Sequence, residues 1–144
     1  MKRYLRHILT YYTNELTKKT DRRDVYIANV AAKITTADDL PNVVVDATKS
    51  DTDIAGMITL LKVGEKEADV TAKKVLLDDV DEGADNNAQL TAYNTAVTDY
   101  TKAKTASDAL NDIIVARAQL AVKEADVEAT SDAKDAAETK YNEA

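Results

Sequence analysis

The chain has 144 residues, a formal net charge of −7, one His and no Cys, Trp or Phe. The lack of Cys excludes disulfides and thiolate metal sites, and three isolated Gly residues exclude the Gly-rich loops that bind phosphates. Leu, Ile, Val and Phe make up only about 22% of the chain, just above the range expected for disorder, so we expect a thin hydrophobic core.

The first 23 residues combine an amphipathic helical pattern with positive charge. Apolar residues recur at helical spacing over 3–19 and share one face: Leu5, Ile8, Leu9, Tyr12 and Leu16. Tyr and Arg are enriched at protein interfaces, so we predict a docking surface formed by Arg3, Tyr4, Arg6, Tyr11, Tyr12, Arg22 and Arg23. A basic amphipathic helix also suits a nucleic-acid backbone or an anionic membrane, and that alternative stays open.

Residues 24–82 resemble a head of short helices. The charged stretch 18–24 predicts a hinge before it, and 25–34 has helical spacing, although its β-branched residues also suit a strand. Residues 35–41 predict a turn or short helix stopped by Pro41, the only Pro. The run Val43–Val45 is the best strand candidate, but no second strand lies nearby, so it is a short edge or an extended connector.

Two further helices are expected in this head. Ser50 or Asp51 caps the first, which runs to about residue 62, faces inward with Ile54, Ile58 and Leu61, and stops at Gly64. The second covers about 65–80 and places four apolar residues on one side: Ala68, Ala72, Val75 and Leu76. An acidic loop with Gly83 inside then spans 78–87.

The acidic loop and the single His are the main candidates for a chemical site. Five carboxylates surround Gly83, but Val80 and Gln89 stand where a calcium-binding EF-hand loop needs ligands, which favours a solvated turn. His7 has no local carboxylate and nucleophile to form a catalytic relay, so we expect a surface or interface His. We therefore expect no catalytic residue, no cofactor and no metal.

The tail, 87–141, contains neither Gly nor Pro. As one helix it would be about 80 Å long, whereas a compact chain of this size has a radius of gyration of about 15 Å. The pattern thus predicts either a helical hairpin, broken near Thr105–Asp108 where capping residues occur, or one long helix in an elongated molecule. Such a rod buries little apolar area and needs other chains for support.

One stripe of the tail repeats every eleven residues and consists mainly of Ala. Small side chains let two helices approach closely, so we predict coiled-coil-like helix packing between chains through Leu110, Ile114, Ala118, Ala121, Ala125 and Ala129. The simpler interpretation is that Ala is present only because it favours helix formation.

These patterns predict an all-α protein with a basic docking helix (1–23), a short-helix head (24–82) and a long Ala-rich rod (83–144). They favour a non-enzymatic structural subunit, such as a phage neck, tail or capsid-accessory protein, whose partners are copies of itself and other proteins of the same assembly. The alternative is a peripheral module whose N-terminus contacts nucleic acid or a membrane. Neither a signal peptide nor a transmembrane segment is predicted, so we expect an intracellular or virion location.

Overall fold

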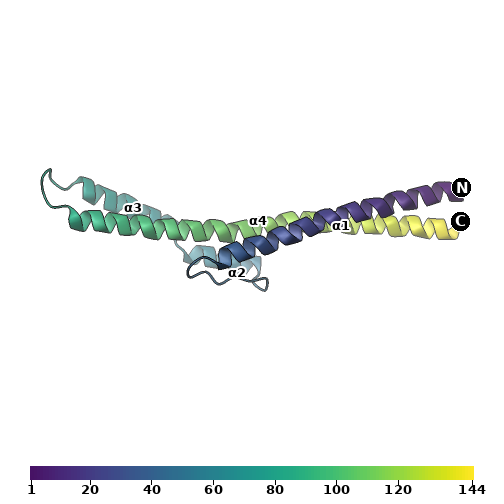
Figure 1. Ribbon diagram of the computed structural model, residues 1–144, viewed down its shortest axis with the longest axis horizontal. Coiled ribbons are helices and arrows are strands. Elements are labelled where there is room, and N and C mark those ends of the chain that lie inside the picture. The colour runs from purple at the N-terminus through teal and green to yellow at the C-terminus, as the bar shows by residue number, and fades with distance from the viewer. The chain divides into compact units, whose positions relative to one another are not determined.

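The computed structural model describes residues 1–144 as four α-helices without any strand (Figure 1). The helices are α1 (Lys2–Asp38), α2 (Asp51–Leu60), α3 (Val63–Asp78) and α4 (Asn87–Glu143). The predicted all-α class is confirmed, as is the long Ala-rich helix, α4, which has 57 residues. None of the helices is long and apolar enough to cross a membrane.

Both long helices run without interruption. Of the two alternatives for the tail, one long helix is confirmed and a break at Thr105–Asp108 is wrong, because α4 continues through these residues. The expected hinge at 18–24 is also wrong: α1 passes through this stretch and reaches 37 residues, so it is not a short helix. Both segments lack Gly and Pro, and Lys and Arg are good helix formers, so a charged stretch alone does not end a helix. The helix α1 ends shortly before Pro41.

The connections explain where the short helices begin. Val43–Val45 forms no strand; Val43 and Val45 are buried and Val44 is exposed, the alternation typical of an extended segment. At the start of α2, the Ser50 hydroxyl accepts a hydrogen bond from the backbone N–H of Asp53, whose carboxylate accepts one from the Ser50 N–H. This reciprocal capping box confirms Ser50 as the cap.

Two details of the α2–α3 region differ from the prediction. Lys62, with φ of 52°, makes the turn between the helices, and Gly64 lies inside α3 rather than at a helix stop. On α3, the side carrying Val75 and Leu76 is exposed, while Leu77 on another side is half-buried. The inward positions of Ile54, Ile58 and Leu61 on α2 and the loop around Gly83 are confirmed.

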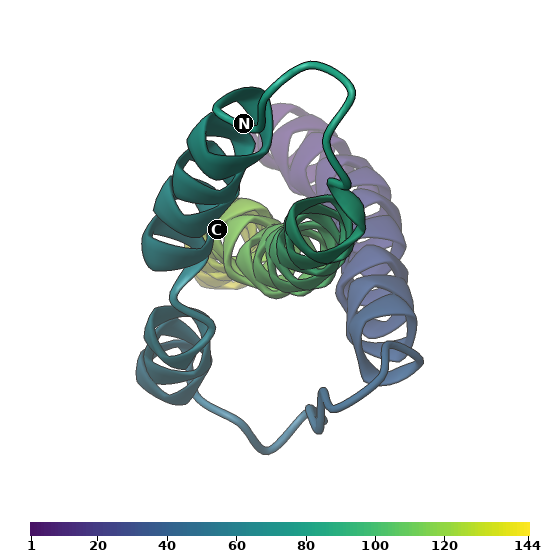
Figure 2. The ribbon, with the colours of Figure 1, turned by 90° about the vertical axis from the view of Figure 1, so that its left-hand side faces the viewer.

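The chain forms two compact units, and both α1 and α4 contribute to each. Unit 1 consists of Met1–Lys33 and Val115–Ala144, and unit 2 of Ile34–Ile114. In unit 2, the first part of α4 lies beside α3, and the connection from α1 crosses to α2 (Figures 1 and 2). The core of unit 2 consists of Ala37, Val43, Val45, Ile54, Ala106, Leu110 and Ile113. The predicted docking helix, head and rod are a functional division that this packing does not test.

Candidate interaction surfaces

Unit 1 is an antiparallel pair of helices. The Lys2 ammonium lies 4.7 Å from the centre of the Tyr141 ring, Lys19 pairs with Asp126, and the Lys123 ammonium lies 5.2 Å from the Tyr26 ring centre. As the residue number rises along α1, its partner on α4 falls, so the two ends of the chain lie side by side (Figure 1).

The seam between these helices follows a seven-residue pattern. On α1, Leu5, Tyr12, Lys19 and Tyr26 are half-buried. On α4, a matching row of buried and half-buried residues comprises Ala116, Lys123, Thr130 and Ala137. Only Ala116 and Ala137 are buried in unit 1, because a helix pair has no third layer to cover its sides. The pair therefore closes off very little apolar surface from water.

Opposite charges stabilise this seam. The Lys19 ammonium lies 2.8 Å from the Asp126 carboxylate, and its hydrogen bond lowers the pKa of Asp126 below the ordinary 3.8, assisted by the charges of Lys123 and Arg22. At the chain ends, a hydrogen bond from Arg6 and its charge lower the pKa of the Tyr141 phenol below the ordinary 10.0. Basic α1 is thus electrostatically matched to acidic α4 within the unit.

The predicted docking residues differ in their exposure. Arg3, Tyr4, Arg6, Tyr11 and Arg22 are exposed, whereas Tyr12 and Arg23 are half-buried. The predicted apolar face of 3–19 is confirmed, because its five members are all half-buried: Leu5, Ile8, Leu9, Tyr12 and Leu16. Docking of this region to a partner stays a prediction.

The predicted Ala stripe is divided by the packing of the chain itself. Leu110 is 1% exposed and belongs to the core of unit 2, and Ile114 packs against that core. The other four members are exposed: Ala118, Ala121, Ala125 and Ala129. Within unit 1, burial follows the seven-residue rows instead of the eleven-residue stripe. Contact of the stripe with another chain stays a prediction.

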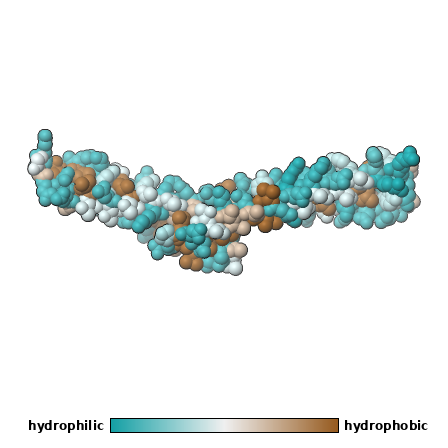
Figure 3. All heavy atoms as spheres, viewed as in Figure 1, coloured by the Kyte–Doolittle hydropathy of each residue, from teal (hydrophilic) through white to brown (hydrophobic).

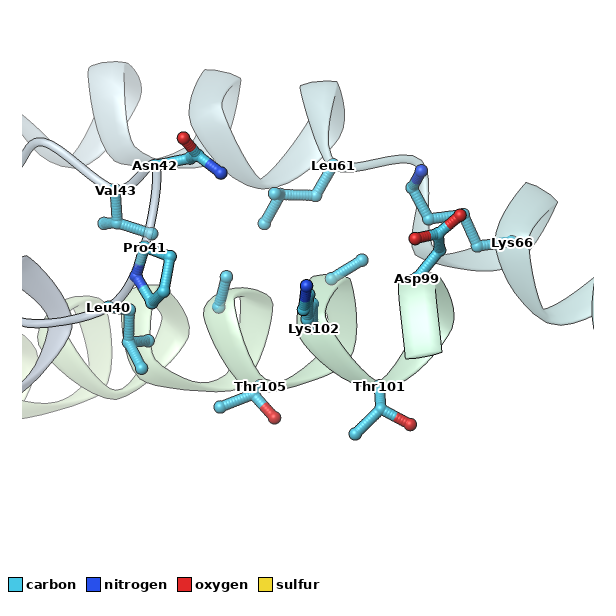
Figure 4. Close-up of a pocket in the computed structure, with 12 residues that line it drawn as sticks. Leu40, Pro41, Asn42, Val43, Leu61, Lys66, Asp99, Thr101, Lys102 and Thr105 are labelled. Atoms are coloured by element: carbon cyan, nitrogen blue, oxygen red, sulfur yellow. The ribbon is translucent and has the colours of Figure 1, made fainter. Parts of the chain in front are cut away.

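Unit 2 contains a cavity of about 360 Å³. Leu40, Pro41, Val43 and Leu61 supply apolar walls, with Ala103 and Ala106 on the α4 side. Figure 4 shows Lys66 and Asp99 at one end, and the hydroxyls of Thr101 and Thr105 directed away from the cavity. This arrangement can accommodate an apolar group. The sequence did not predict this cavity. Among its lining residues, Pro41 was singled out beforehand, but only as the end of a turn or short helix.

The two chemical candidates gain no partners in the structure. His7 is exposed on α1. The acidic loop brings no group of three or more His, Asp or Glu residues into a metal-binding arrangement. Five contact residues of the unit 1 seam were not predicted from the sequence: Lys19, Tyr26, Lys123, Asp126 and Tyr141. The seven-residue spacing of Tyr12, Lys19 and Tyr26 was the available signal.

Comparison of the chain with protein-family models, with curated proteins and with solved structures finds no match.

Proposed function

We propose that the protein is a non-enzymatic structural subunit that associates with copies of itself through its helices, within a larger protein assembly. The observation that carries the proposal is the exposure of large apolar residues on a unit with almost no buried ones. Tyr4, Tyr11, Val25 and Val122 are between 58% and 67% exposed, while the two buried residues of unit 1 are both Ala. Covering these side chains with another helix pair would supply the missing layer.

A small phage virion component, such as a neck, tail or capsid-accessory protein, is the specific role we propose for such a subunit. Two features support it: large apolar residues of unit 1 are exposed while its two buried residues are both Ala, and the net charge of −7 opposes non-specific association. We propose this role by analogy with the architecture. It requires the self-association that light scattering of the purified chain measures.

The test is the mass of the purified chain in solution. We expect light scattering to give a mass above the 15.7 kDa of a single chain, rising with protein concentration, and to retain the excess in high salt. Apolar contacts are insensitive to screening, whereas phosphate contacts weaken steeply with salt. A chain that stays monomeric at every concentration contradicts the proposal.

The second candidate is a module that binds nucleic acid or an anionic membrane through α1. Arg3, Arg6 and Lys18 are exposed on this helix, which favours it. Against it, Lys18 pairs with Glu15, and Lys19 and Arg23 pair with Asp126 and Asp24. Filter binding to nucleic acid and flotation with anionic vesicles test it. Strong binding that salt abolishes and that Arg3→Gln with Arg6→Gln weakens would favour this candidate over the first.

A further inference from the structure

Five of the seven large apolar residues exposed in unit 1 lie on one side of the helix pair: Tyr4, Tyr11, Val25, Val115 and Val122. Tyr4, Tyr11, Lys18 and Val25 each precede a residue of the α1 seam row, and Val115, Val122, Ala129 and Ala136 each precede one of the α4 row. All eight are exposed. A preceding residue lies about 100° around the helix from the seam. In an antiparallel pair, the same rotation on both helices leads to the same side. We call these eight residues the lateral face.

The charge environment of Asp126 agrees with this placement. Arg22 precedes the half-buried Arg23, and Asp126 precedes the half-buried Val127, so both should lie on the side of the lateral face. The Arg22 charge contributes to the lowered pKa of Asp126, in agreement with the placement of both side chains on the same side of the pair. The residues of the lateral face therefore share a surface across the two helices.

The opposite side of the pair is polar. The residues that follow the seam rows are Arg6, Thr13, Thr20 and Ile27 on α1, and Arg117, Glu124, Ser131 and Glu138 on α4. Only Ile27 among them is apolar. In Figure 3 the side of unit 1 in view is mainly hydrophilic, with separate brown patches. By residue exposure, most of the large exposed apolar side chains of unit 1 belong to the lateral face, as expected of a contact surface.

We infer that a second copy of the chain covers the lateral face, so that α1 of each copy lies along α4 of the other in a four-helix bundle. The inference rests on the proposed self-association and specifies its geometry. Two helices of about 30 residues form a face about 45 Å long and about 20 Å wide, or about 900 Å². A stable interface needs about 800 Å² per partner, so one lateral face suffices.

Charge selects this pairing over the other two-fold arrangement. Within unit 1, α1 carries eight basic and three acidic residues, while α4 carries four basic and seven acidic ones. Placing α1 beside α1 of the second copy would oppose two basic helices and bring the two Lys18 side chains together at the middle of the face. Placing α1 beside the partner's α4 repeats between copies the charge match of the unit 1 seam.

The chain has no Cys, so single Cys residues can report this geometry directly. The unit 1 register puts Tyr11 level with Ala133, which precedes the half-buried Lys134 on the lateral side of α4. A Tyr11→Cys chain and an Ala133→Cys chain are mixed and oxidised. We expect a shift from monomer to disulfide-linked dimer on a non-reducing gel. Thr13→Cys with Ala133→Cys is the matched control, because Thr13 lies on the polar side, and it should stay monomeric.

Each other outcome contradicts the inference in a different way. A chain that is monomeric by light scattering overturns both the proposed function and this geometry. A self-associating chain that gives no Tyr11→Cys to Ala133→Cys product overturns only the geometry. A dimer formed by Lys18→Cys alone shows that α1 pairs with α1. Circular dichroism of each variant checks that its helices are intact, and three of the four substituted residues are exposed: Tyr11, Thr13 and Lys18.

Discussion

The two units show different ways of stabilising the same long helix. In unit 2, α4 packs into a core in which Ile54, Leu110 and Ile113 are at most 1% exposed. In unit 1, α4 has a single neighbour, and its contacts are an ion pair, cation–π contacts and half-buried side chains. A helix pair without a third layer therefore leaves its apolar sides open, while the part of the same helix that has several neighbours can exclude water.

The largest expected effect comes from truncating the same residue type in each unit. Leu110→Ala should lower the free energy of unfolding by about 2–5 kcal/mol, because it leaves a cavity in the core of unit 2. Leu120→Ala, on the same helix but half-buried in unit 1, should cost clearly less. Urea unfolding measures both. Equal losses would mean that the units do not differ in packing as described.

The next prediction concerns assembly through the Ala stripe. Ala118→Glu with Ala125→Glu should reduce a larger assembly to the dimer formed by the lateral face, because these exposed residues point away from the seam and charged side chains prevent close helix approach. Sedimentation of the parent and the variant measures the change, and Ala118→Ser with Ala125→Ser is the control. If the Glu variant sediments like the parent, the stripe is not an interface.

A smaller effect is expected at the start of α2. Ser50→Ala removes the hydroxyl that accepts the Asp53 N–H and should cost about 0.5–2 kcal/mol of stability in unit 2. Thr52→Ala, at the exposed second residue of the same helix, should be nearly neutral. Thermal unfolding followed by circular dichroism compares them. A Thr52→Ala loss as large as that of Ser50→Ala would argue against the capping box.

The smallest effect is a pH dependence in unit 1. The pKa of Asp126 is lowered below 3.8, so its ion pair with Lys19 stabilises the fold above that pH and is lost as the pH falls through the folded pKa. Stability of the parent should therefore fall more than that of Asp126→Asn as the pH drops from about 5 to about 3. Urea unfolding at each pH tests the sign. A parallel decline in the two proteins would show that the pair contributes nothing.

Local sequence patterns predicted the helices well and their contacts less well. The amphipathic face of 3–19 and the inward face of α2 were correct, because apolar spacing reports which side of a helix avoids water. The hinge at 18–24 failed because charged residues mark a solvent-exposed or paired surface as well as a loop; Lys19 meets Asp126, far along the chain. Local spacing likewise did not predict that Val75 and Leu76 of α3 are exposed.

The sequence by itself determined that this chain is helical, where α4 runs and that the chain has little apolar material for a core. Those properties depend on Gly and Pro placement, on helix propensity and on composition, which are local. Tertiary structure alone decided that α1 is one helix paired with the end of α4, and that burial follows seven-residue rows while Tyr4, Tyr11, Val25 and Val122 stay exposed. The physical reason is that a helix with apolar residues on several sides has several faces it can bury, and only its neighbours choose among them.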